Sequence, residues 1–189
     1  MTTALDPLAH GAVLLGHQSL RHLRAALDRD AGAQGAVYLQ QAGFASGASV
    51  ATLFGGWLAG EHGVHDAGAL DAAAFDRIVS QFFTATGWGT LALVRIHPAV
   101  VALDSADWAE ADPATRTEHP SCAFSCGMLA EFLSRVTGHP FAVLEVECRS
   151  RGDARCRFLA GAPESMAGLY ERLAAGDGYA AALGLPTPA

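Results

Sequence analysis

Residues 122–127 read Cys-Ala-Phe-Ser-Cys-Gly, and residues 145–156 read Glu-Val-Glu-Cys-Arg-Ser-Arg-Gly-Asp-Ala-Arg-Cys. These two stretches hold all four cysteines of the chain. Such clustering is typical of a site for a soft divalent metal, because zinc takes four thiolate, imidazole or carboxylate ligands in a tetrahedron. The alternative is a pair of disulfides, and the rest of the sequence helps to decide between the two.

Length and composition indicate a single domain. The chain has 189 residues, of which 51% are hydrophobic and 16% charged, and its mean hydropathy is +0.23. A chain of this length buries roughly 70% of its unfolded surface, which is enough for a sizeable core. We expect one domain over residues 1–189, with its core at about 10–176 and a C-terminal tail at 177–189.

Charge and the N-terminal sequence restrict the compartment and the partners. No basic segment precedes an apolar stretch at the N-terminus, and we find no uncharged apolar run of the roughly 20 residues that cross a bilayer. We therefore expect a cytoplasmic protein with no membrane span, whose reduced thiols favour metal binding over disulfides. The net charge is −7 and the chain has no lysine, so we expect no nucleic-acid partner.

Hydrophobic periodicity predicts helices that alternate with antiparallel hairpins, an α+β domain. Glycines at 32 and 35 are expected to end the first helix, and 61–70 to form a loop. Expected helices cover 11–29, 48–59, 71–86, 122–136 and 164–175, and expected strands cover 36–40, 90–96, 99–104, 141–148 and 156–159.

The spacing of the cysteines suits a common site. Cys122 and Cys126 are four residues apart on an expected helix, so both lie on one side of it. Cys148 and Cys156 bracket an expected hairpin, and the Gly-Asp pair at 152–153 suits a turn that brings them together.

The segment from about 120 to 160 resembles the 4-vinyl reductase domain family, which takes its name from a bacteriochlorophyll biosynthesis protein. The resemblance rests on Cys122 with Gly127 five residues later, and on Glu145, Cys148 and Cys156 with Gly-Asp between the last two. It implies an antiparallel sheet with packed helices, similar to the ligand-binding fold of nitric-oxide sensors and Golgi transport complex subunits. The family also includes aromatic-sensing domains of bacterial transcriptional activators.

The resemblance also implies a structural zinc ion held by Cys122, Glu145, Cys148 and Cys156. One objection comes from geometry: side chains alternate along a regular strand, so Glu145 and Cys148 should face opposite sides. Either the strand bulges or ends between them, or Cys126 supplies the fourth ligand in place of Glu145.

No residue is assigned a catalytic role, because the sequence lacks a nucleotide-cofactor fingerprint and a site closed by four ligands is structural. His62, His65 and Asp66 could form a separate metal or acid–base group, and His119 could replace a ligand of the cysteine site.

We expect a domain that binds a small hydrophobic molecule, an aromatic or a tetrapyrrole, in a sensing or carrier role and as a homodimer. Aromatic residues are the candidates to line its apolar pocket. The alternatives are a catalytic or accessory part in 4-vinyl reduction, and a ligand-free dimerisation module. The candidate aromatic residues are Phe75, Phe82, Phe83, Trp88, Phe124, Phe132 and Tyr170.

Overall fold

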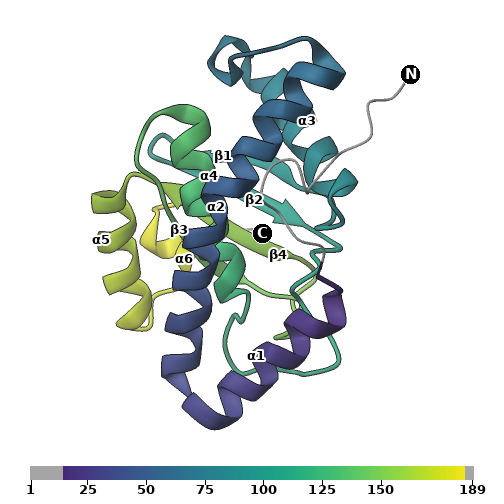
Figure 1. Ribbon diagram of the computed structural model, residues 1–189. Helices are drawn as coiled ribbons and strands as arrows, with labels where there is room; N and C mark the ends of the chain where they lie inside the picture. The colour runs from purple at the N-terminus through teal and green to yellow at the C-terminus, as the bar shows by residue number, and fades with distance from the viewer. Residues whose placement is uncertain (1–14, 186–189) are drawn as a thin grey trace.

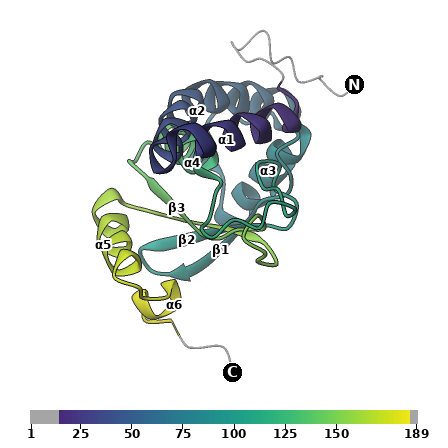
Figure 2. The ribbon, with the colours of Figure 1, turned by 90° about the horizontal axis from the view of Figure 1, so that it is seen from below.

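One antiparallel sheet of four strands lies between two layers of helices in the computed structural model, which describes residues 15–185. The strand order is β1-β2-β4-β3, and every neighbouring pair is antiparallel. Helices α1 to α4 lie on one side of the sheet and α5 and α6 on the other (Figure 1, Figure 2). The elements are α1 (His17–Ala31), α2 (Ala33–His62), the short 3-10 helix η2 (Ala67–Ala69), α3 (Ala72–Ala85), β1 (Ala92–His97), β2 (Val100–Ser105), α4 (Ala123–Thr137), β3 (Ala142–Glu147), β4 (Cys156–Gly161), α5 (Pro163–Ala174) and α6 (Tyr179–Ala182).

This architecture confirms the predicted α+β class with an antiparallel sheet. Helices α3, α4 and α5 and the two hairpins lie within about two residues of their expected ranges. The domain bounds stay a prediction, since residues 10–14 and 186–189 lie outside the described residues. Residues 179–182, which fall in the expected tail, form α6.

The interpretation of 36–40 as a strand is wrong, because α2 runs unbroken over thirty residues. Glycine suggested turns in this region, but at two positions it permits the close approach of α2 to α4. A Cβ atom on Gly43 would lie 1.9 Å from the carbonyl oxygen of Phe124, and one on Gly127 would lie 2.0 Å from that of Gln40. Only glycine allows two helix backbones to come this close.

Length and composition alone would allow α2 to span a membrane, a possibility that the division into strand and helix had hidden. Its most apolar window of 18 residues has a mean hydropathy of 1.2, and 28% of that window is buried. Among the described residues no other helix meets these two criteria. The core helix of a folded domain meets them as well, and α2 makes its most extensive contacts with α4 (Figure 2).

Two hydrophobic cores lie on the two sides of the sheet. The larger core fills the space between the sheet and helices α2, α3 and α4, and it includes all four cysteines. The smaller core lies between the sheet and α5, with Val146 of β3 and Leu159 of β4 among its members. Side chains of β3 and β4 therefore reach both cores, which matters for the site described next.

Candidate functional site

Three cysteines and one glutamate meet at one end of the larger core. Cys122 is the N-cap residue of α4, Glu145 lies on β3, and Cys148 and Cys156 flank the turn that joins β3 to β4. One potential ligand atom from each of the four lies within 4.8 Å of the other three. The cluster that the sequence predicted therefore forms, and Glu145 is part of it.

A bulge in β3 explains how Glu145 and Cys148 face the same site. Glu145 pairs with Phe158 and Glu147 pairs with Arg157, which leaves Val146 without a partner on β4. The strand then ends at Glu147, one residue before Cys148. An extra residue in one strand shifts the alternation of side chains, so the objection from a regular strand does not apply.

Backbone and side-chain contacts fix the cluster. The amide of Cys122 donates to Oε2 of Glu145 at 2.8 Å, and the amide of Cys148 donates to Asp153 at 2.7 Å. The sulfur atoms of Cys122 and Cys148 are 3.8 Å apart. That distance is far too long for a disulfide, and all four cysteines are free. Two sulfurs bound tetrahedrally to one zinc ion, each at roughly 2.3 Å, lie about 3.8 Å apart.

The donor set fits a metal cation. Oε1 of Glu145 is buried and has no hydrogen-bond partner among residues 15–185, although buried carboxylate oxygens normally have one. Burial raises the pKa of Cys122 and, with the charge of Cys148, that of Glu145 well above their ordinary values. Hydrogen bonds from Cys122 and Cys156 lower the pKa of the Cys148 thiol. A cation at the centre would compensate the negative charge that these groups hold when all are ionised.

Two alternative ligands lie outside this group. Cys126 is buried one turn further along α4, within the larger core, and burial raises its pKa well above the ordinary value. His119 is exposed. Neither belongs to the group of four ligand atoms.

A buried polar network beside the cysteines was not predicted from the sequence. Glu110 accepts hydrogen bonds from the amides of Phe124 and Ser125 at 3.1 and 2.8 Å, and from the Ser125 hydroxyl. Its carboxylate therefore supplies the cap that Cys122 does not give to α4. Burial raises the pKa of Glu110 to about 7, against the effect of these hydrogen bonds. An acidic residue twelve positions before a helix carries no sequence signal for capping, which is why Glu110 escaped notice.

Arg24 of α1 joins this network. The side chain is buried and donates to the backbone oxygen of Glu110 at 2.9 Å and to Ser121 at 3.2 Å. Arg24 therefore connects α1 to the loop that leads into α4.

Aromatic rings fill the larger core above the sheet. Phe54, Phe82, Phe83 and Phe132 are fully buried, and their ring centroids lie 5.2 to 6.3 Å apart in the contacting pairs. Three of these residues were among the predicted pocket candidates. Tyr170, another candidate, is exposed on α5 and lies outside this group.

His62 lies at the rim of the aromatic cluster. Its ring meets that of Trp57 edge to face with centroids 5.0 Å apart, and Trp57 contacts Phe82 at 5.7 Å. The Nε2 atom of His62 is buried without a hydrogen-bond partner among the described residues. The predicted grouping with His65 and Asp66 does not form, because His65 is exposed and Asp66 caps η2 through the amide of Gly68.

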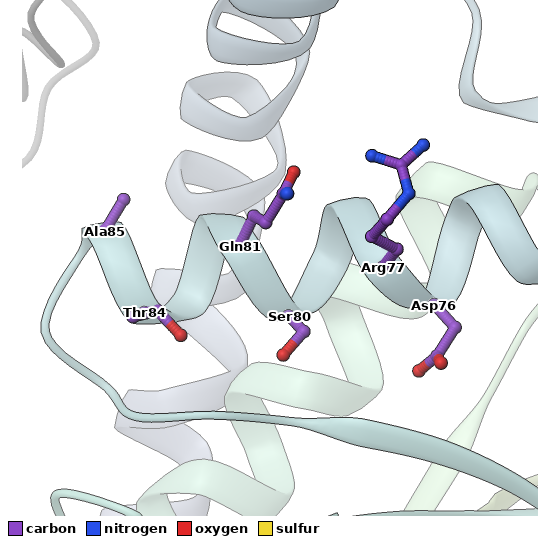
Figure 3. Close-up of a pocket in the computed structure, with 6 residues that line it drawn as sticks. All are labelled: Asp76, Arg77, Ser80, Gln81, Thr84 and Ala85. Atoms are coloured by element: carbon purple, nitrogen blue, oxygen red, sulfur yellow. The ribbon is translucent and has the colours of Figure 1, made fainter.

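An open hollow of about 500 Å³ runs along α3 (Figure 3). Two of the side chains that line it serve the sheet edge, since Asp76 accepts from the amide of Leu93 and Ser80 from that of Leu91. Its mixed polar lining does not match the apolar pocket expected from the sequence. The lining residues are Asp76, Arg77, Ser80, Gln81, Thr84 and Ala85.

Comparisons with known proteins agree with this geometry. Residues 106–162 match the family model of the vinyl-4-reductase domain. The fold is similar to that of the phenol-responsive sensory domain of the transcription activator PoxR, solved with phenol, with a TM-score of 0.62 and 19% identity over 86% of this chain and 82% of that one.

A vinyl-4-reductase family protein from Methanocaldococcus jannaschii shows 20% identity over 65% of this chain and 66% of that one, with a TM-score of 0.43. The comparison with curated proteins gives no match. Over residues 106–162 the chain thus carries the vinyl-4-reductase domain that its cysteine spacing predicted, within a fold similar to that of a phenol-responsive sensory domain.

Proposed function

We propose that this chain is a sensing or carrier domain that binds a small aromatic molecule and is braced by a structural zinc ion. The observation that carries the proposal is the buried group of three cysteines and Glu145, whose unpartnered Oε1 atom is available to a metal. The proposal uses this group for stability and assigns the binding of the aromatic molecule to the other side of the larger core.

Zinc is the metal that suits this donor set best. Three thiolates and a carboxylate form a tetrahedral site, and thiolates select zinc over the hard cations magnesium and calcium. Bound there, the ion would join the start of α4 to the β3–β4 hairpin. Four protein ligands leave no open position for substrate, so the ion would stabilise the fold rather than take part in a reaction.

Metal content tests this part of the proposal directly. Elemental analysis of untagged protein purified without chelator should find about one zinc per chain, and chelation should lower the free energy of unfolding. A zinc content below about half an equivalent would contradict it. Free thiols of this kind also favour a reducing compartment, and we propose the cytoplasm.

We place the aromatic ligand at the rim of the ring cluster, beside Trp57 and His62. Both residues are half-buried, so the rim can be reached without unfolding the core. The unpartnered Nε2 atom of His62 can bond a ligand hydroxyl, and apolar sites with few polar groups are typical of small-molecule pockets. A molecule with one hydroxylated ring suits this rim better than a tetrapyrrole does. The phenol bound by the PoxR domain is such a molecule.

Phenol is the probe that we would use first. Isothermal titration calorimetry should detect binding to the wild type, and His62→Ala should weaken it at least about tenfold, the effect of one lost hydrogen bond in a dry site. His65→Ala is the matched control, since His65 is exposed three residues further on. Equal affinities of His62→Ala and the wild type would remove His62 from the site. Failure of phenol to bind at millimolar concentration would contradict a phenol-type ligand.

One surface favours a homodimer as well. The exposed face of α2 carries Val37, Tyr38 and Phe44, each between 41% and 51% exposed, and α2 has no charged residue before Glu61. Exposed apolar patches of this kind often mark contacts between proteins. We propose that this face joins two copies. Analytical ultracentrifugation should show a dimer that Tyr38→Glu dissociates, and a wild-type monomer at high micromolar concentration would contradict it.

A further inference from the structure

The β3–β4 hairpin presents different chemistry on its two faces. Cys156 points into the larger core with the cysteine group, while its neighbours Arg155 and Arg157 point to the opposite side. The bulge has a matching effect on β3. Glu145 faces the cysteines, and Glu147 faces Arg155 and α6.

The residues on the second face form a closed network, which we call the clasp: Asp104, Glu147, Arg155, Arg157 and Tyr179. Arg157 binds both oxygens of Asp104, at 2.7 and 2.6 Å, and Arg155 binds both oxygens of Glu147, at 2.8 and 3.1 Å. Arg155 also reaches Asp104 at 3.2 Å. Because each guanidinium faces carboxylates of its own, the arginine cluster of the hairpin is not a free anion site.

Tyr179 connects this network to α6. Its hydroxyl donates to Glu147 at 2.6 Å and accepts from Arg157 at 2.8 Å, and the Arg157 guanidinium lies 5.7 Å from its ring centroid. Tyr179 is the first residue of α6, which is only four residues long. Helices this short are not stable alone, so α6 depends on its contacts for its structure.

The metal group and the clasp alternate along the same backbone. Glu147 lies between Glu145 and Cys148, and Cys156 lies between Arg155 and Arg157. A change in the twist or register of this hairpin therefore moves both sets of side chains, because a shift of one residue exchanges the two faces of a strand.

We propose that metal binding on one face of the hairpin and docking of α6 on the other stabilise each other. The inference rests on the zinc site proposed above. With the metal bound, the hairpin holds Glu147 and Arg157 where they receive the Tyr179 hydroxyl. Without the metal the hairpin relaxes, the clasp loses its geometry, and α6 detaches. The clasp thus makes the position of α6 a readout of the state of the cysteine site.

Such coupling must be reciprocal, which makes it testable without removing any metal ligand. Tyr179→Phe removes the hydroxyl and keeps the ring. Tyr170→Phe is the matched control, because Tyr170 is exposed on α5 and lies outside the clasp. The zinc affinity of the full chain would be measured by competition with a chromophoric chelator. Hydrogen exchange by mass spectrometry would follow a peptide that covers α6 and a reference peptide from α3.

We expect Tyr179→Phe to exchange faster in α6 and to bind zinc about fivefold more weakly, at the lower end of typical couplings between sites. Tyr170→Phe should match the wild type in both measurements. In the wild type, partial removal of zinc should accelerate exchange in α6 and leave α3 unchanged.

Three results would overturn the inference. Unchanged exchange in the Tyr179→Phe variant would mean that the clasp does not hold α6. Faster exchange with a zinc affinity within twofold of the wild type would mean that the two faces are independent. A wild type that fails to compete for zinc at all would overturn the metal site itself, and the chelator assay distinguishes this result from the second.

Discussion

Replacing Gly43 by alanine should separate the helix pair on which the larger core rests. The added Cβ atom would lie 1.9 Å from the Phe124 carbonyl oxygen and 2.8 Å from its carbon. Both atoms belong to the backbone of the first turn of α4, so no side-chain rotation relieves the overlap. The Phe124 carbonyl lies only two residues after Cys122, the metal ligand that α4 contributes.

The size of the effect follows from the distances. Ordinary contact needs the two atoms at least 3.4 Å apart, so α2 and α4 must move apart by roughly 1.5 Å, enough to forfeit much of the dispersion energy between facing atoms. Overpacking of a core typically destabilises by about 1–3 kcal/mol. Here the obstacle is rigid backbone, so we expect at least about 3 kcal/mol. The gain in helix propensity from glycine to alanine returns only about 1 kcal/mol.

Gly55→Ala is the matched control in the same helix. A Cβ at that position meets nothing within 4 Å, so the substitution should raise the free energy of unfolding by about 0.5–1 kcal/mol. Urea unfolding followed by circular dichroism and tryptophan fluorescence measures both variants under the same conditions. If Gly43→Ala proves as stable as Gly55→Ala, the close approach of α2 and α4 is wrong.

Three further predictions concern the buried groups around the cysteines. The pKa of Glu110 is about 7 in the fold against 4.5 for an ordinary glutamate, so the folded state binds this proton more tightly. The contribution of Glu110 to stability therefore falls as pH rises from about 4.5 to 7, by about 3 kcal/mol, and urea titrations of Glu110→Gln should lack that slope; a slope equal to that of the wild type would assign it to other groups. Arg24→Met leaves the Glu110 carbonyl without its donor and should lower the free energy of unfolding by about 2 kcal/mol, whereas Arg29→Met, at an exposed residue, should not change it; equal effects in urea unfolding would contradict the buried contact. Glu145→Ala should weaken zinc binding by more than about 100-fold, because even indirect partners of a metal contribute up to that factor, while Cys126→Ala should stay close to the wild type in chelator competition; the reverse order would make Cys126 the fourth ligand.

The helical part of the fold was predictable where apolar residues repeat at a helical period, as in α3 and α4. The failure in α2 has a physical cause. Glycine lowers helix propensity by about 1 kcal/mol per residue, so a stretch with several glycines predicts turns. Packing reverses this preference at Gly43, because the partner backbone leaves no room for a side chain. A local pattern contains no information about that partner, which lies some 80 residues away in the sequence.

The candidate site was predictable in its residues but not in its geometry. Cysteine spacing and the family resemblance selected Cys122, Cys148 and Cys156, and left Glu145 and Cys126 as alternatives. Only the pairing of β3 with β4 shows the bulge that directs Glu145 to the cysteines. His62 was considered with His65 as a polar group, whereas its contact with Trp57 depends on the curvature and length of α2.

The unpaired Val146 limits how this sequence can vary over evolutionary time. Hairpins usually tolerate the gain or loss of a residue near their turn, but here the loss of one residue between Glu145 and Glu147 would exchange the inward and outward positions of the strand. Apolar replacements of Val146 should persist, since the side chain only fills the smaller core. Single-residue deletions at this point should be absent from functional descendants, and the two faces of the hairpin are therefore inherited as one unit.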